Sequence, residues 1–114
     1  MITSSNINFD QVIEGGKLIR NSYYALYYMS KETGKCRLGI SIPKSKLQKA
    51  HERNRLRRVI RNSVGALKNE SIDVVFLLRK NLDQSSKNDA IIVRDLLLKD
   101  SNTILLTKKK NGIR

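Results

Sequence analysis

The sequence has little of the residues from which catalytic centres and metal sites are usually built. Its 114 residues include one cysteine, one histidine and 10 acidic residues. Cys36 cannot form a disulfide within the chain, which is typical of a reducing compartment. One histidine and one cysteine cannot supply a protein-only zinc site, and the scattered carboxylates show no pair suited to a two-metal nuclease centre. A self-sufficient enzyme is therefore not expected, and His51 is predicted to be a solvated or packing residue.

Long apolar runs are also missing. No stretch approaches the ~18 uninterrupted apolar residues that could cross a bilayer. The first residues, MITSSNINFDQ, lack the basic start and apolar run of a signal peptide. There is no glycine-rich phosphate loop either, because Gly15-Gly16 matches neither nucleotide-binding fingerprint. A cytoplasmic protein without a membrane partner is therefore expected.

Positive charge, by contrast, is abundant. Lysine and arginine number 23, which gives a formal net charge of +13 and a sequence pI near 10.2. Such an excess repels itself unless a polyanion relieves it. The charge is densest at residues 50–64, AHERNRLRRVIRNSV, where only Glu52 opposes five arginines: Arg53, Arg55, Arg57, Arg58 and Arg61.

This arginine-rich segment also has the apolar period of a helix. With successive residues 100° apart, its apolar side chains gather on one side and most of its arginines on the other. Guanidinium groups bind phosphate oxygens in bidentate fashion and stay charged at any accessible pH, so nucleic acid is the favoured partner. The residues predicted to bind nucleic acid are Arg53, Asn54, Arg55, Arg57, Arg58 and Arg61, with Lys44, Lys46 and Lys49 of the preceding connection.

The first half of the chain is expected to form one helix and two strands. Ser4 and Ser5 can cap a short helix that runs to about Glu14. Residues 21–30 (NSYYALYYMS) and 36–43 (CRLGISIP) alternate in the manner of strands. The KETGK sequence between them predicts a turn, so the two strands are expected to pair as an antiparallel hairpin.

The second half is expected to continue with a buried strand at 72–79, because IDVVFLLR is almost continuously apolar. The remaining elements are expected to be a polar loop at 81–88, a helix at 89–99, a break at 100–103, a short strand or final turn at 104–106 and a disordered basic tail at 108–114. This order predicts one α+β domain over residues 1–107, a two-layer sandwich of helices on a mixed sheet.

Residues 39–61, GISIPKSKLQKAHERNRLRRVIR, closely resemble the signature of the bacterial ribonuclease P protein component, G-(I/L)-x-V-x-K-K-x-x-x-A-V-x-R-N-R-x-K-R-x-x-R. The RNR core of that signature is matched at 53–55. Arg57-Arg58 stands where the family has Lys-Arg, and Arg61 closes the motif. One departure, Lys44-Ser45-Lys46 in place of paired lysines, bears on the phosphate contacts.

Shorter matches extend the resemblance over most of the chain. FDQVI at 9–13, followed by Gly16-Lys17, resembles the family's N-terminal helix, although Ile13 stands where an aromatic residue is frequent. YALY at 24–27 resembles the following aromatic strand, and DVV at 73–75 with Leu78-Arg79 resembles the family's D-(Y/I)-V-(V/I)-I-A-R strand.

The resemblance implies a fold like the second domain of a small-subunit ribosomal protein, with the arginine-rich helix in a left-handed βαβ crossover, a rare hand. It also implies that the protein joins a large catalytic RNA and that the complex removes the 5′ leader of precursor tRNA. Hydrolysis would be done by the RNA and its Mg²⁺ ions. The chain would count as an enzyme only as a subunit of that endoribonuclease holoenzyme.

A small basic protein can also hold a part of the substrate that the RNA does not read. Aromatic rings hold a single strand by stacking, worth ~1–3 kcal/mol per base, while basic residues follow its backbone. By resemblance, the leader cleft lies between the N-terminal helix and the sheet, and its candidate residues are Phe9, Lys17, Tyr24 and Tyr27, with Lys44 as a further cation. Phe9 could equally be a core residue, and the odd spacing of the tyrosines prevents both from lining one cleft.

Three other readings remain open from the sequence alone. A structural RNA-binding protein of the ribosomal type would have the same charge and no preference for a leader. A helix-turn-helix DNA regulator is disfavoured by the strand-rich first half and by the lack of a second short helix beside the arginine-rich one. An independent nuclease would need a carboxylate cluster.

Overall fold

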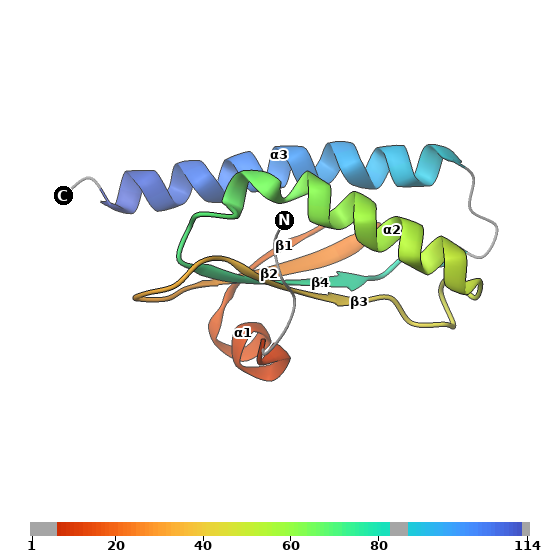
Figure 1. The fold of residues 1–114 in the computed structure, drawn as a ribbon, viewed down its shortest axis with the longest axis horizontal. Coiled ribbons are helices and arrows are strands. Elements are labelled where there is room, and N and C mark those ends of the chain that lie inside the picture. Colours follow the sequence, from red (N-terminus) through yellow and green to blue (C-terminus); the bar gives the residue numbers. More distant parts are fainter. Residues whose placement is uncertain (1–6, 83–86, 113–114) are drawn as a thin grey trace.

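A mixed four-stranded sheet forms the centre of the fold, and two long helices cover one of its faces (Figure 1). The computed structural model describes residues 7–82 and 87–112. Its elements are α1 (Phe9–Gly15), β1 (Lys17–Arg20), β2 (Tyr24–Ser30), β3 (Arg37–Ser41), α2 (Ala50–Ser63), the 3₁₀ turn η1 (Gly65–Leu67), β4 (Ile72–Leu78) and α3 (Lys87–Gly112). The α+β class and the mixed sheet are as expected, and α1 adds a partial layer on the opposite face (Figure 1).

The strand order is β1-β2-β4-β3, so the expected hairpin between β2 and β3 is wrong. β4 lies between them, antiparallel to β2 and parallel to β3. The reason is burial: six of the seven β4 residues are buried, and such a strand is most stable where both of its edges are paired. α2 is the connection between the parallel strands β3 and β4, as the resemblance implies, and the left-handed sense of that crossover stays a prediction.

β1 was not expected from the sequence. Its four residues, KLIR, are too few to show a period, but they pair antiparallel with β2 from Lys17↔Tyr28 to Arg20↔Ala25. The connection between the two strands is fixed by Asn21, whose Oδ1 accepts hydrogen bonds from the backbone N–H groups of Tyr23 and Tyr24 at 2.8 and 3.0 Å.

The main core lies between the sheet and the helices α2 and α3. Tyr24 and Phe76 contribute the largest rings, with centroids 4.9 Å apart, and both are fully buried. The helices bury an apolar stripe against them, as the helical period of the arginine-rich segment predicts. Its members include Leu56, Ile60, Val64, Leu67, Val93, Leu97 and Ile104.

α1 packs on the other face of the sheet and buries Val12 there. It is capped by Asn8, whose side chain accepts a hydrogen bond from the Gln11 N–H at 3.0 Å, whereas the expected caps, Ser4 and Ser5, lie outside the described residues. The helix ends at the glycine pair, as expected. A Cβ on Gly16 would lie 2.7 Å from the Tyr28 carbonyl oxygen, so the chain can pass this close to β2 only without a side chain.

α3 is one helix from Lys87 to Gly112, so the expected break at 100–103 and the expected short strand or final turn at 104–106 are wrong. The disorder expected of the basic tail at 108–114 stays a prediction. The polar residues that look like a stop have tertiary partners instead. The Tyr24 hydroxyl donates to Asp100, and Ser101 Oγ donates to the Ser63 carbonyl at 3.4 Å. Ile104 is buried in the core cluster. Tertiary packing therefore stabilises the helix over residues whose own helix propensity is low.

Candidate nucleic-acid interface

α2 spans Ala50–Ser63, in agreement with the expected helix, and buries Leu56, Ile60 and Ser63. Its arginines differ in exposure and in contacts. Arg55 and Arg58 are exposed, whereas Arg57 and Arg61 are half-buried. We call these four arginines the basic face of α2.

Arg53 does not belong to this face. Its guanidinium Nη1 donates to the carbonyl oxygens of Leu47 at 2.9 Å and Gln48 at 2.5 Å, the two residues before the N-cap Lys49. The arginine thereby ties the lysine-rich connection to α2. Arg57 donates to Asn54 Oδ1 at 3.1 Å, which orients both side chains along the helix surface.

Three arginines of α2 remain available to an external anion. Within residues 7–82 and 87–112, Arg55, Arg58 and Arg61 form no hydrogen bond or ion pair. Lys44 and Lys49 lie exposed on the connection that leads into α2, and Lys46 is half-buried there. All eight predicted RNA-binding cations thus lie on α2 or on the connection that leads into it.

A second candidate surface lies on the sheet face that carries α1. Strand register places Leu18, Tyr27, Val75 and Gly39 side by side across the four strands on this face. Phe9 of α1 lies directly over Gly39, because a Cβ on that glycine would come within 2.5 Å of the ring's Cζ atom. Phe9 and Tyr27 are both half-buried, so each is part of the packing and is still partly exposed to solvent.

Gly39 was missed as a site residue by sequence reasoning. A glycine inside a strand commonly marks a close approach of another group, and that signal was available in the sequence RLGIS. Here the approaching group is the Phe9 ring, which needs the space that a side chain would fill.

Two of the predicted leader-binding residues do not lie on this face. Tyr24 is fully buried in the core beside Phe76, so its assignment to the leader cleft is wrong. Desolvation and the Asp100 carboxylate raise the pKa of its hydroxyl far above the usual range. Lys17 pairs with Tyr28, one residue out of step with Tyr27, so the two lie on opposite faces of the sheet.

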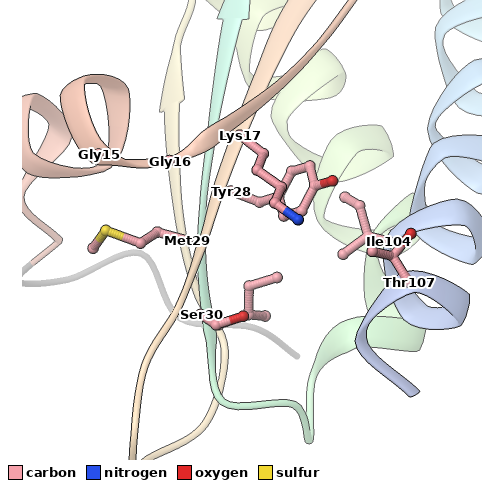
Figure 2. A pocket seen from close by; sticks show the side chains of 9 residues that line it. Gly15, Gly16, Lys17, Tyr28, Met29, Ser30, Ile104 and Thr107 are labelled. Atoms are coloured by element: carbon pink, nitrogen blue, oxygen red, sulfur yellow. The ribbon is translucent and has the colours of Figure 1, made fainter. Parts of the chain in front are cut away.

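Lys17 borders a hollow between the sheet and the end of α3 instead. Figure 2 shows its ammonium group beside the Tyr28 ring, across from Ile104 and Thr107. The hollow has a volume of about 180 Å³, and Ser30 adds a further hydroxyl to its lining. Lys17 is thus separated from Phe9 and Tyr27 by the sheet.

A buried carboxylate on the α1 side of the sheet was also missed. Asp73 accepts hydrogen bonds from Arg37 Nε at 3.0 Å and Nη2 at 2.7 Å, and pairs with Lys31 Nζ at 2.9 Å. Burial raises the pKa of Asp73, but the hydrogen bonds from Arg37 and Lys31 outweigh that effect and hold it below the usual range. Two cations around one anion leave this end of the face net positive. No local pattern links Arg37 to Asp73, which is 36 residues away.

No helix within residues 7–82 and 87–112 is long and apolar enough to cross a membrane. In the same part of the chain, no three histidine, cysteine, aspartate or glutamate side chains gather where they could hold a metal ion.

The fold and the two surfaces define a class of protein: a small, strongly basic α+β domain with one cationic helix face and one face of mixed aromatic and cationic character. Comparison with known families then places the chain. The family model described as Ribonuclease P matches residues 3–99, so the chain belongs to the ribonuclease P protein family.

Individual relatives agree with this placement. The chain is 32% identical over 75 residues to the ribonuclease P protein component of Legionella pneumophila strain Corby, a match that covers 66% of each chain. It is 34% identical over 89 residues to the corresponding protein of Mesoplasma florum, covering 75% of this chain and 80% of the relative. The chain therefore spans slightly less than two thirds of the length of the Legionella relative.

Solved structures of the family have the same fold. The RNase P protein of Thermotoga maritima, solved in complex with 1-(4-fluorophenyl)-2-thiourea, is 28% identical, with a TM-score of 0.66 over 80% of this chain and 88% of that one. The RNase P protein of Staphylococcus aureus is 25% identical, with a TM-score of 0.67 over 86% and 92% of the two chains.

Proposed function

We propose that the chain is the protein subunit of a cytoplasmic ribonuclease P holoenzyme. In this role it binds the catalytic RNA and the 5′ leader of precursor tRNA, and assists the endonucleolytic removal of that leader. The observation that carries the proposal is the family membership together with the basic face of α2. Hydrolysis is assigned to the RNA, and the Mg²⁺ ions that the reaction would need would be held mainly by that RNA.

The basic face of α2 is the proposed contact with the catalytic RNA. Its unpaired arginines, Arg55, Arg58 and Arg61, have the fork geometry that suits phosphate oxygens. Arg53 and Asn54 contribute by holding the connection and the neighbouring arginine in place. The net charge of +13 neutralises crowded phosphates. Because this lowers the repulsion between RNA and substrate, the two can approach each other.

The α1 side of the sheet is the proposed leader site. Phe9 and Tyr27 share this face, and their partly exposed rings can stack with unpaired bases. Lys44 remains the candidate cation for the leader's phosphates, while Lys17 is no longer one. Mature tRNA lacks the single-stranded segment, so only the precursor gains these contacts.

Reconstitution tests the proposal. The purified protein is mixed with a bacterial ribonuclease P RNA at low Mg²⁺ concentration, and cleavage of a precursor tRNA is followed with and without protein. Protein alone should leave the precursor intact, RNA alone should cleave poorly, and the mixture should cleave efficiently. If the mixture binds RNA but never gains activity, the chain is a structural RNA-binding protein. Cleavage by RNA-free protein through stringent purification would make it an independent nuclease.

A further inference from the structure

A groove between α2 and α3 lies beside the basic face of α2 and has a different chemistry. It consists of two hollows of about 250 and 190 Å³ that share Val59 and Arg94 in their linings. The first is completed by Arg55, Ala90 and Ile91, and the second by Asn62, Ser63 and Leu98. None of the proposed roles of the chain uses the α3 side of this groove.

The floor of the groove is apolar and open to solvent. Ile91 and Leu98, both on α3, expose 44% and 47% of their surface. Exposed apolar side chains clustered in a concave site are typical of a binding surface.

Two guanidinium groups border this floor, one from each helix. Arg55 of α2 has no hydrogen-bonding partner among the described residues. Arg94 of α3 donates through Nε to Asp95 Oδ1 at 3.1 Å, and its Nη2 forms an ion pair with the same oxygen at 3.1 Å. Guanidinium planes stack on flat aromatic rings. The groove thus offers an apolar floor between two stacking groups.

The charge of the site selects among occupants. A second copy of this chain would bring another net charge of +13 toward the two arginines, and repulsion disfavours that contact. A phosphate alone would gain nothing from the apolar side chains of Val59, Ala90 and Ile91, because it binds through charge and hydrogen bonds. An unpaired nucleotide satisfies both features, because its base is flat and largely apolar and its phosphates are anionic.

We propose that this groove receives an unpaired base of the RNA partner, held between Arg55 and Arg94 over Val59 and Ile91. The inference rests on the proposed function, because it takes the catalytic RNA as the partner of α2. It goes further in giving α3 a part in RNA binding and in assigning a base contact to a surface otherwise expected to touch only phosphates.

The first test separates stacking from charge. Affinity of the protein for a bacterial ribonuclease P RNA is measured over a range of salt concentrations for Arg94→Lys and for the control Arg20→Lys, an exposed arginine of β1. Lysine keeps the charge but loses the flat guanidinium. Arg94→Lys should weaken binding roughly 5- to 150-fold, the range of one lost stack, with an unchanged salt slope. Equal affinities of Arg94→Lys and wild type would overturn the proposal.

The second test uses two adjacent isoleucines of α3. Ile91 lines the groove and Ile92 does not, yet they are 44% and 39% exposed. Ile91→Ser should weaken RNA binding roughly 4-fold or more through lost apolar contact, while Ile92→Ser should not. Because both side chains are exposed, this comparison still decides the matter if Arg94→Lys were to unfold the protein.

The outcomes also separate this inference from the proposed function. If wild type fails to bind the RNA and to stimulate cleavage, the proposed function fails and the groove has no RNA partner. If wild type does both, but Ile91→Ser and Arg94→Lys match it, only the groove assignment fails. A dimer seen by sedimentation equilibrium that Ile91→Ser dissociates would show instead that a second copy occupies the groove.

Discussion

The hydroxyl of Tyr24 donates a hydrogen bond to the carboxylate of Asp100, joining the centre of the sheet to the middle of α3. Tyr24 is fully buried, and its ring packs on Phe76. This contact explains two features at once. The tyrosine is withdrawn from any RNA-binding surface, and a helix whose sequence contains Asp100-Ser101-Asn102 continues without a break.

Removing this hydroxyl should destabilise the fold. Tyr24→Phe leaves Asp100 without its donor, and an unsatisfied partly buried acceptor costs ~1–3 kcal/mol of unfolding free energy. Urea denaturation measures the loss. Tyr28→Phe is the matched control, since Tyr28 packs against the same core and its hydroxyl has no hydrogen bond with a described residue. Equal stability of the two variants would mean that the Tyr24–Asp100 contact contributes nothing.

The unpaired arginines of α2 should dominate the salt dependence of RNA binding. In Arg58→Ala/Arg61→Ala, two phosphate contacts are lost, so the slope of log K against log salt should become shallower by roughly 1.4–1.8. Lys68→Ala, an exposed cation outside α2, is the control. An unchanged slope in the double variant would remove Arg58 and Arg61 from the interface.

Arg53→Ala should behave differently from these variants. It removes the donor to the Leu47 and Gln48 carbonyls, so the connection before α2 loses its tie to the helix. We expect lower thermal stability and faster amide hydrogen exchange over 44–49, as well as weaker RNA binding. A variant with wild-type exchange and a shallower salt slope would instead make Arg53 a phosphate contact.

Asp73 should make the stability of the fold sensitive to acid. Folding lowers the pKa of this carboxyl, so its contribution is present above its unfolded value of about 3.9 and is lost as the pH falls through the lower folded value. Asp73→Asn should be less stable than wild type at neutral pH, and the difference should shrink below about pH 4. Urea midpoints across this range measure it, with the exposed Asp95→Asn as control. A constant difference at all pH values would contradict the assignment.

The space at Gly39 should matter for the leader. Gly39→Ala displaces the Phe9 ring, and Phe9→Ala removes it, so each should lower the affinity of the holoenzyme for precursor tRNA. Loss of one stacked base corresponds to ~1–3 kcal/mol, and mature tRNA should be unaffected. The two changes act through one ring, so the double variant should bind no worse than Phe9→Ala. Additive losses would mean that Gly39 acts independently of Phe9. If Phe9→Ala loses stability alone, Phe9 is a core residue.

Local patterns in the sequence predicted what depends on local structure. The arginine-rich helix and the buried strand at 72–78 each have a strong period or apolar run of their own, and both are present. The pairing of β2 with β4 could not be read in this way, because it is decided by which strand gains most from a central place. The continuation of α3 also depends on Tyr24, 76 residues away from Asp100.

The candidate site likewise has features that the sequence predicts and features that depend on the folded structure. Composition was enough to find the arginines of α2, since charge density is visible in the sequence. Their individual roles were not visible, because Arg53 bonds to Leu47 and Gln48 only once the connection has folded back on the helix. The exclusion of Tyr24 and Lys17 from the leader face likewise followed from strand register and packing rather than from residue type.

The place of β4 in the sheet has a consequence for the order of folding. The strands β2 and β3 leave the ribosome well before β4, yet each finds its main partner only in β4. During synthesis, the first half of the chain therefore carries unpaired strand edges, and the long separation between partners slows the closing step. Because synthesis proceeds from the N-terminus, the highly charged α2 also emerges before β4. The nascent chain thus presents arginines to surrounding polyanions before its sheet can form.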